Sequence, residues 1–575
     1  MKLPAFAAAL LLSACASAPA PAPRQSVDVV IRGGTIYDGS GSAPFVGDVA
    51  IAGQRIVYVG PRTLGRGRVE IDAAGKAVSP GFINMLSWAN ESLIADGRAL
   101  SDLVQGVTLE VMGEGSSMGP WSPEMKRRET ERQSDIRYDV TWTTLDEYLT
   151  HLERRGVSPN VASYVGAETV RTHVLGEGDV DPTPAQLDTM RGLVRGAMED
   201  GAVGVGSSLI YAPGTYAETP ELIALATEAG RCGGGYISHM RYESDRLLEG
   251  VDELIAIARA SGAPSEIYHL KAAGRANWPK LDTAVARIEA ARAQGLRVTA
   301  DMYTHTAGST GLDAAMPPWV QAGGVEAWVA RLKDPATRAR VVAEMRDPAA
   351  RFENLYRHAG AEGTLLVGFK TDRLKPLTGK TLAEVARQRG VSPEDAAIDL
   401  VIEDGTRIQV IYFLMDEANV RRQTALPWMS FGSDAEAPAP EGVFLKSSTH
   451  PRAYGNVARL LGKYVRDERA LTLQEAVRKL TSLPAANLGL HDRGALREGA
   501  FADVVVFDPG AVREIATYEK PHQLATGVSH VLVNGRFALR DGLPTGASTG
   551  QVVRGRGWRG WPDGGCRATS AAWAR

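Results

Sequence analysis

The chain has 575 residues, and its 64 basic and 67 acidic side chains give a formal net charge of −3 at pH 7. This near balance of charges gives no reason to expect a nucleic acid as partner. Because 44 % of the residues are hydrophobic, the composition is that of a globular protein with a large core, and the length favours one large domain with a smaller one.

The N-terminal segment has the features of an export signal followed by a tether. A short positive start precedes an apolar run, Leu3–Leu12, which is too short to span a bilayer. Two small residues stand directly before Cys15, a pattern similar to a bacterial lipobox. We therefore expect residues 1–15 to be a lipoprotein signal peptide that ends at a lipidated Cys15, and residues 16–25 to be a linker. A plain secretory signal with an incidental cysteine is the alternative.

The expected location follows from the same segment. Ser17 stands where an aspartate would retain a lipoprotein at the inner membrane, so the resemblance to lipoproteins implies an outer-membrane protein that faces the periplasm or the cell surface. No other stretch approaches the ~20 apolar residues of a membrane helix, and we expect a protein that is anchored to the membrane by its lipid. Cys232 and Cys566 then remain, and two distant cysteines predict no disulfide framework.

The two ends of the chain are rich in short strand-like runs. Val27–Gly33 and Ala502–Phe507 are examples, and they suggest one small β-sandwich formed by residues 26–80 and 490–552. The last residues, 553–575, are rich in Arg, Gly and Trp without periodicity, and we expect them to be disordered or loosely packed.

Between these ends, residues 81–489 alternate short apolar runs with amphipathic stretches, as successive β–α units require. This alternation predicts an α/β protein with a (β/α)8 TIM-like barrel, in which chemistry takes place where the strands end. The stretch from about 311 to 425 is too long for one connection and is expected to be an insertion. The predicted strand ends lie near Phe82–Leu86, Val107–Met112, Val161–Val165, Ala202–Ser207, Tyr236–His239, Ile267–Lys271, Val298–Tyr303 and Met429–Asp434.

Two histidines close consecutive strand-like runs. His239 ends Tyr236–His239, and His269 follows the next run along the chain. A single histidine at a strand end is more often structural, but two at matching positions on neighbouring strands favour a metal site, since neutral imidazole is a common zinc ligand.

Two carboxylates lie at other predicted strand ends. Asp434 follows the last run and is placed for proton transfer to and from a reacting group, or equally for capping the next helix. Glu114 stands between Gly113 and Gly115, which leave room for close approach to a ligand. It is either a metal ligand or a solvated loop charge.

A series of motifs adds a family resemblance from about Asp28 to Gly542. Each motif is weak alone, but together they resemble the amidohydrolase superfamily, and within it the D-aminoacylases, which hydrolyse N-acyl-D-amino acids. The motifs are Pro80–Asn84, Ser207–Gly214, His239–Arg241, His269–Lys271, Gly432–Asp434, His450–Gly455, Thr481–Ala485, Asp492–Gly494 and Ala502–Pro509.

The resemblance implies roles for individual residues. His239 and His269 match metal-binding histidines, and Asp434 matches the catalytic aspartate. The positions that hold the substrate carboxylate are matched by Tyr211, Lys271 and Arg452. An arginine fork suits that task because it can pair with both carboxylate oxygens. Alternatively, Arg452 forms a structural ion pair, Tyr211 is a packed aromatic and Lys271 is a surface charge.

Departures from the family pattern lie on one side of its two-metal site. Leu86 and Trp88 replace the His-x-His motif, Gly115 aligns with a metal-bridging cysteine, and Ala167 aligns with a further histidine. We therefore expect one metal ion per chain, zinc or another divalent cation, with Glu114 as third ligand. Leu86 and Trp88 are expected to make that part of the site apolar.

The predicted activity is metal-dependent hydrolysis of a C–N amide bond, with a small N-acyl amino acid as substrate. In this mechanism Asp434 activates the attacking water and then protonates the leaving amine. A D-dipeptidase, a cyclic amide hydrolase or a catalytically inactive ligand-binding lipoprotein are the alternatives. The sequence does not predict the oligomeric state or the acyl and side-chain preference.

Overall fold

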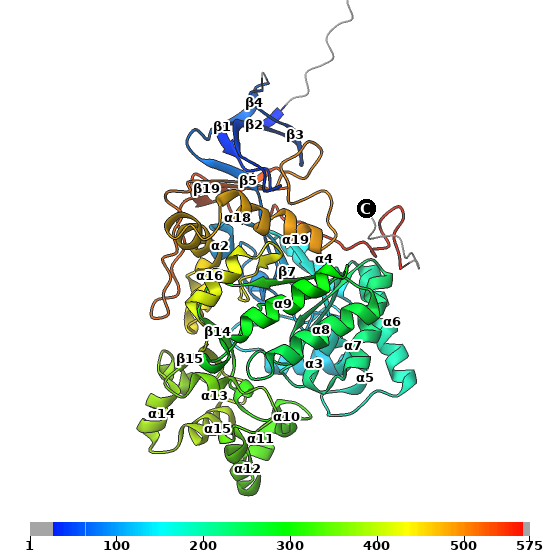
Figure 1. Ribbon diagram of the computed structural model, residues 1–575, viewed down its shortest axis with the longest axis vertical. Coiled ribbons are helices and arrows are strands. Elements are labelled where there is room, and N and C mark those ends of the chain that lie inside the picture. Colours follow the sequence, from blue (N-terminus) through cyan, green and yellow to red (C-terminus); the bar gives the residue numbers. More distant parts are fainter. Residues whose placement is uncertain (1–26, 64, 567–575) are drawn as a thin grey trace, which may run out of the picture.

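The computed structural model describes residues 27–63 and 65–566 (Figure 1). Cys15 and the predicted signal peptide and linker lie outside the described residues, as do the last nine residues of the chain. Within the described part, no helix is long and apolar enough to cross a membrane.

Eight parallel strands form a barrel in the described chain, as predicted. They pair in chain order, and β8 and β9 run as one strand interrupted at Tyr164. The ring closes between the last strand and the first, where the Met85 N–H donates to the Phe431 carbonyl at 3.1 Å. The barrel strands are β6 (Phe82–Asn84), β7 (Val107–Met112), β8 (Asn160–Ser163) with β9 (Val165–Gly166), β10 (Gly204–Ser208), β11 (Gly235–His239), β12 (Ser265–Ile267), β13 (Val298–Met302) and β17 (Met429–Phe431).

Helices surround the barrel and pack on the outward side chains of its strands (Figure 1). Local sequence fixes their ends: α6 starts with a capping box between Thr183 and Gln186, and it stops at Gly201, which adopts the left-handed conformation that favours glycine. The longer helices are α3 (Pro123–Arg132), α4 (Leu145–Arg155), α5 (Ala167–Leu175), α6 (Pro184–Asp200), α7 (Thr219–Arg231), α8 (Leu247–Ser261), α9 (Lys280–Ala293), α16 (Glu417–Ala425), α17 (Arg452–Arg459) and α18 (Leu473–Leu480).

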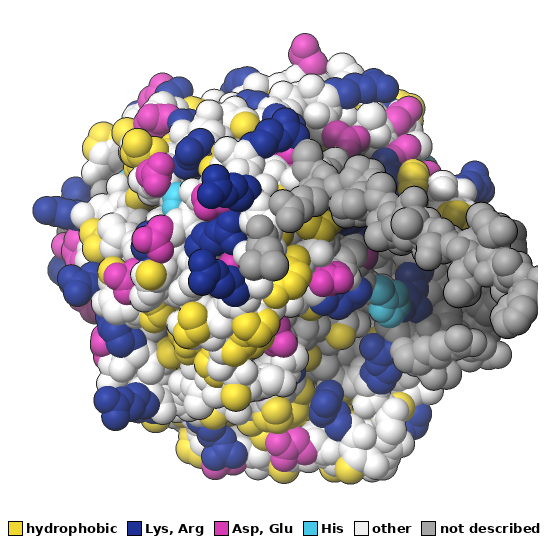
Figure 2. Space-filling view, turned by 90° about the horizontal axis from the view of Figure 1, so that it is seen from above, with side chains coloured by type: hydrophobic (Ala, Val, Ile, Leu, Met, Phe, Trp, Pro, Cys, Tyr) yellow, Lys and Arg dark blue, Asp and Glu magenta, His cyan; other side chains and the backbone are white. Residues whose placement is uncertain are grey.

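Both ends of the chain meet in one nine-stranded sheet, which confirms the smaller β-domain. Its N-terminal and C-terminal parts join where β18 pairs antiparallel with β5. Acidic and basic side chains are interspersed over the coloured part of this end of the molecule, with apolar side chains between them (Figure 2). The strands are β1 (Val27–Ile36), β2 (Phe45–Ala52), β3 (Arg55–Gly60), β4 (Gly67–Asp72), β5 (Ala77–Pro80), β18 (Val504–Phe507), β19 (Val528–Val533), β20 (Arg536–Arg540) and β21 (Leu543–Pro544).

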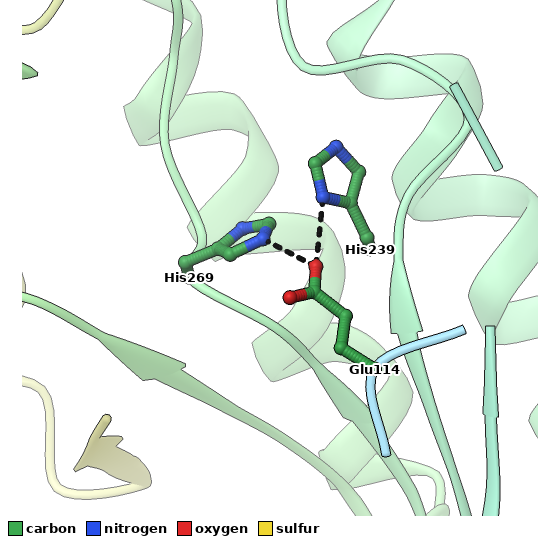
Figure 3. Close-up of side chains that lie close together, drawn as sticks. All are labelled: Glu114, His239 and His269. Atoms are coloured by element: carbon green, nitrogen blue, oxygen red, sulfur yellow. Dashed lines mark hydrogen bonds and ion pairs between the residues drawn. The ribbon is translucent and has the colours of Figure 1, made fainter. Parts of the chain in front are cut away.

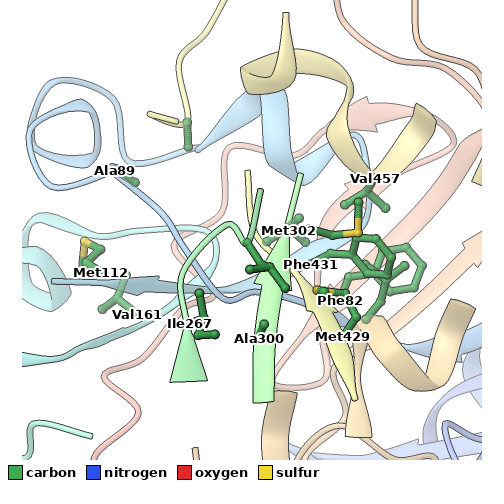
Figure 4. Packing of buried hydrophobic residues seen from close by; sticks show 14 of the residues in the cluster. Phe82, Ala89, Met112, Val161, Ile267, Ala300, Met302, Met429, Phe431 and Val457 are labelled. Carbon is green, nitrogen blue, oxygen red and sulfur yellow. The ribbon is translucent and has the colours of Figure 1, made fainter. Parts of the chain in front are cut away.

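The barrel core continues into this sheet. The ring of Phe82, on the first barrel strand, lies 6.0 Å from that of Phe507 on β18, in an edge-to-face arrangement. Met429 and Phe431 from β17 and Val457 from α17 pack in the same cluster (Figure 4). The β-domain is therefore held rigidly against the end of the barrel where β6 begins.

A separate layer lies between β13 and β17, in the region where an insertion is predicted. Three antiparallel strands, in the order β14-β16-β15, support several short helices and enclose an apolar cluster of their own. Figure 1 shows this layer at the end of the molecule opposite β4. Its elements are β14 (Ala307–Gly311), β15 (Thr364–Gly368), β16 (Gln409–Phe413), α10 (Pro318–Gln321), α11 (Val325–Leu332), α12 (Pro335–Arg346), α13 (Leu355–Ala359), α14 (Leu382–Arg389) and α15 (Pro393–Asp404).

The structure corrects two expectations for the C-terminal segment. Residues 553–566 are ordered against the barrel: the Val553 N–H donates to the Val161 carbonyl at 2.8 Å, and the Gly555 N–H donates to the Gly201 carbonyl at 2.9 Å. Cys232 and Cys566 form a disulfide across 334 positions of the chain. The tail lacks periodicity because main-chain hydrogen bonds and one covalent link hold it, rather than an amphipathic face.

Candidate active site

Neighbouring strands bring the two predicted histidines together. His239 is the last residue of β11, and His269 follows β12, its parallel neighbour, so both side chains emerge at the same end of the barrel. Their rings are 4.4 Å apart, and both are almost completely buried. The backbone at His269 has φ of 35°, in the left-handed region, a strained conformation often found at functional sites.

Glu114 completes a three-residue group. Its Oε1 lies 3.0 Å from His239 Nδ1 and 3.0 Å from His269 Nε2 (Figure 3). The turn depends on its flanking glycines: Gly113 and Gly115 have φ of 105° and 68°, and a Cβ on Gly115 would lie 2.5 Å from the Cβ of Ser208. The glycines therefore let the loop after β7 approach the barrel axis.

This group suits a divalent cation. One ligand atom from each residue lies within 4.8 Å of the others, and all three side chains are buried. Zinc binds imidazole nitrogen and carboxylate oxygen at about 2.0–2.2 Å, so tetrahedral ligands lie roughly 3.3 Å from one another. The separations between Glu114 and the histidines are close to this value.

The charges around the site also favour a cation. Burial and the ammonium of Lys271 lower the pKa of His269, but the surrounding carboxylates outweigh both and raise it to about 10. Burial likewise opposes ionisation of Glu114, yet the two imidazoles hold the pKa of its carboxyl well below the usual range. The protein thus stabilises positive charge at the place where the three ligand atoms meet.

A further acid, Glu243, orients these ligands and was not predicted. Its Oε1 accepts a hydrogen bond from Lys271 Nζ at 2.7 Å and lies 3.1 Å from His269 Nδ1, while its Oε2 lies 3.6 Å from His239 Nε2. Lys271 Nζ also lies 2.7 Å from His269 Nδ1, so this ring nitrogen is held between an ammonium and a carboxylate. Glu243 lies four residues after His239 in an irregular loop, so no periodic pattern identifies it.

Asp434, as predicted, lies at the end of the last barrel strand. Its Oδ2 is 2.9 Å from Nη1 of Arg452, and its Oδ1 accepts a hydrogen bond from Trp88 Nε1 at 3.2 Å. Burial raises the pKa of its carboxyl above the usual value, although Arg452 opposes the shift. This environment suits a group that takes up and releases a proton.

The prediction that Leu86 and Trp88 make this side apolar is wrong for one of the two. Leu86 is fully buried in an apolar cluster below the site. The Trp88 indole N–H, however, donates to Glu114 Oε2 at 2.9 Å as well as to Asp434. Trp88 therefore contributes a hydrogen-bond donor, its indole N–H, at a place where the sequence predicted only an apolar ring.

The predicted carboxylate-binding residues surround the same space. The Tyr211 ring lies 5.1 Å from that of His239, and Lys271 is paired with Glu243. The Arg452 guanidinium, at the start of α17, lies 4.4 Å over the ring of Tyr303. Arg452 is 2 % exposed, and its Nε finds no hydrogen-bond acceptor in the described chain, whereas its Nη1 is paired with Asp434. Such a buried, unsatisfied donor is unusual and marks a place for a ligand.

Comparison with known proteins places these observations in a family. The amidohydrolase family profile matches residues 69–538. An N-acyl-D-aspartate deacylase of Alcaligenes xylosoxydans is 33 % identical over 92 % of this chain and 96 % of its own.

Two solved structures have the same fold at similar identity. An N-acyl-D-glutamate deacylase from Bordetella bronchiseptica, complexed with zinc and a phosphonate mimic of the tetrahedral intermediate, superposes with a TM-score of 0.76 at 29 % identity, covering 92 % of this chain and 100 % of that one. A D-aminoacylase, described by one-metal activation and second-metal attenuation of a binuclear centre, gives 0.76 at 30 % identity over 92 % and 99 %.

Proposed function

Because the chain belongs to the amidohydrolase family, in the branch of the N-acyl-D-amino-acid deacylases, we propose that it hydrolyses the amide bond of N-acyl-D-amino acids to a carboxylate and a free D-amino acid. The observation that supports this most directly is the group formed by Glu114, His239 and His269, which lies beside an acid, Asp434, and a buried cation, Arg452, whose Nε has no acceptor in the described chain. A hydrolase for N-acyl amino acids needs these three elements close together.

His239, His269 and Glu114 would hold one divalent cation per chain, and zinc is our proposal because a relative binds it. When bound, such a cation polarises the scissile carbonyl and favours ionisation of the attacking water. Glu243 and Lys271 hold the His269 ring in the orientation that directs its Nε2 toward Glu114.

Asp434 carries the proton in this proposal. It accepts a proton from the attacking water and then donates it to the leaving nitrogen, which would otherwise depart as an unstable amide anion. Trp88 and Arg452 each hold one of its carboxylate oxygens, so the group is oriented before the substrate binds.

The substrate carboxylate is held by the Arg452 fork, with Lys271 and Tyr211 near it. A carboxylate along the Nε–Nη2 edge of the guanidinium would accept from Nε, the donor of Arg452 that has no acceptor in the described chain. Binding at this point would place the adjacent amide over Asp434 and the three ligand residues, because Arg452 is in contact with Asp434.

Metal content and turnover test this function together. We expect about one zinc per purified chain, its loss in His239→Ala, and hydrolysis of N-acetyl-D-amino acids by the unmodified protein. Asp434→Asn is expected to retain its metal while turnover disappears. An active Asp434→Asn variant would refute the role of Asp434. If the unmodified protein hydrolyses only dipeptides or only cyclic amides, that class of compound replaces the N-acyl-D-amino acids as its substrate.

We also propose that the protein is exported and anchored to the outer membrane through Cys15. The Cys232–Cys566 disulfide supports export, because disulfides form and persist in oxidising compartments. Incorporation of labelled palmitate and recovery in the outer-membrane fraction test this, and both should be lost in Cys15→Ser. Labelling that persists in the variant would contradict the proposal.

A further inference from the structure

One indole N–H connects the two carboxylates of the site. Trp88 Nε1 lies 2.9 Å from Glu114 Oε2 and 3.2 Å from Asp434 Oδ1, so a single donor is shared between two acids. The main chain at this residue is also held in place, since the main-chain N–H of Trp88 donates to the Ala435 carbonyl at 2.9 Å. The link therefore joins the loops after β6, β7 and β17.

The indole N–H contacts one oxygen of each carboxylate, Glu114 Oε2 and Asp434 Oδ1. Glu114 directs its other oxygen, Oε1, to the two histidines, and Asp434 directs Oδ2 to Arg452. The facing pair, Glu114 Oε2 and Asp434 Oδ1, would otherwise be two carboxylate oxygens across a narrow gap. Such a pair repels unless a donor or a cation lies between its members.

A divalent cation commonly lies between two facing carboxylates in proteins and removes their repulsion, because hard divalent ions prefer oxygen ligands. Here the indole N–H of Trp88 lies at that place, and it stabilises the negative charge of both carboxylates by hydrogen bonding, without an ion. The indole ring also fills the volume beside the gap, with 37 % of its surface exposed.

We propose that Trp88 restricts this chain to one metal ion by occupying the position between Glu114 and Asp434 where a second cation would bind, and that its N–H positions Asp434 for proton transfer. This inference rests on the metal site proposed above. A D-aminoacylase relative is described by one-metal activation and second-metal attenuation, so a built-in donor at this position would give activity that excess metal does not attenuate.

The experiment separates the N–H from the bulk of the ring. Trp88→Phe removes the donor and keeps a ring, and Trp88→Ala removes both. Trp319→Phe is the matched control, because Trp319 Nε1 donates to Glu344 Oε2 at 2.9 Å in the insertion, away from the site residues. Bound zinc per chain is measured by equilibrium dialysis against increasing free zinc, and kcat and KM are measured in parallel.

We expect zinc binding to saturate at one ion per chain for the unmodified protein and the control, and also for Trp88→Phe, because the phenyl ring still blocks the space between the two acids. Trp88→Phe should lower kcat about 10- to 100-fold with little change in KM, since a misplaced catalytic group costs rate rather than binding. Trp88→Ala should take up a second, weaker zinc, and its residual turnover should fall as that zinc binds.

Two zinc ions on the unmodified protein, or one on Trp88→Ala at saturation, would overturn the restriction to one metal. An unchanged kcat in Trp88→Phe would overturn the positioning role, and this result does not depend on Trp88→Ala being soluble. Absence of zinc from the unmodified protein would instead refute the metal site proposed above, so the two failures are distinguishable.

Discussion

Replacement of Arg452 by lysine tests how the substrate is recognised. Arg452→Lys keeps a positive charge beside Asp434, whose Oδ2 lies 2.9 Å from the guanidinium, but it removes the planar fork. Nη1 is paired with Asp434, but Nε has no acceptor in the described chain, and a substrate carboxylate on the Nε–Nη2 edge would accept from both of these nitrogens. The variant should therefore lose one of two charge-assisted hydrogen bonds to the substrate.

The magnitude follows from that count. A hydrogen bond to a charged group contributes about 1.5–3 kcal/mol. This corresponds to a decrease in kcat/KM of roughly 10- to 150-fold, and the loss should appear mainly in KM.

The assay compares two substrates that differ only in the group facing Arg452: an N-acetyl-D-amino acid and its carboxamide, which lacks the negative charge. The unmodified enzyme should prefer the acid, and Arg452→Lys should lose most of that preference. The ratio of the two effects isolates the Arg452–carboxylate interaction from any change at Asp434. An equal loss on both substrates would refute the reasoning, because it would show that Arg452 acts through Asp434 alone.

Three further predictions concern the surroundings of the site. Glu243→Gln should weaken zinc binding about 10- to 100-fold, measured by competition with a chelator, because the carboxylate beside His269 Nδ1 and Lys271 is lost. Gly115→Ala should displace Glu114 and lower the zinc content, since φ is 68° and the added Cβ would meet Ser208 at 2.5 Å; a variant with full zinc content would contradict the glycine argument. Burial raises the pKa of Glu353 to about 7 from 4.5, so its ionisation on going from pH 4.5 to above 7 should cost the folded state about 3 kcal/mol. The free energy of unfolding, measured by denaturant titration, should therefore decrease less for Glu353→Gln than for the unmodified protein between pH 5 and pH 8. Equal decreases in the two proteins would show that ionisation of Glu353 does not cause the loss.

The sequence predicts those parts of the site that lie on regular elements. His239, His269 and Asp434 follow buried strands, and the rule that barrel chemistry lies at strand ends was enough to place them together. Glu114 was predictable from its flanking glycines, because a loop with two left-handed residues can turn its side chain back toward the barrel axis.

The other site features depend on contacts between distant segments. The sequence predicts an apolar role for Trp88, and only the folded barrel shows that its indole N–H donates to Glu114 and Asp434. Glu243 lies in an irregular loop after β11, where no period marks which acid turns inward. The cysteines of the Cys232–Cys566 disulfide are 334 positions apart in the sequence, and spacing carries no information at that distance.

That disulfide has a topological consequence when a protease cuts the chain. It closes a loop that contains four barrel strands, from β11 to β17, together with the whole layer between β13 and β17. A single proteolytic cut anywhere in this loop leaves both fragments covalently joined, and a cut between β11 and β17 leaves barrel strands in each of them. The molecule thus keeps its mass and connectivity after one cut in any exposed turn of the loop, until a reductant opens the cystine.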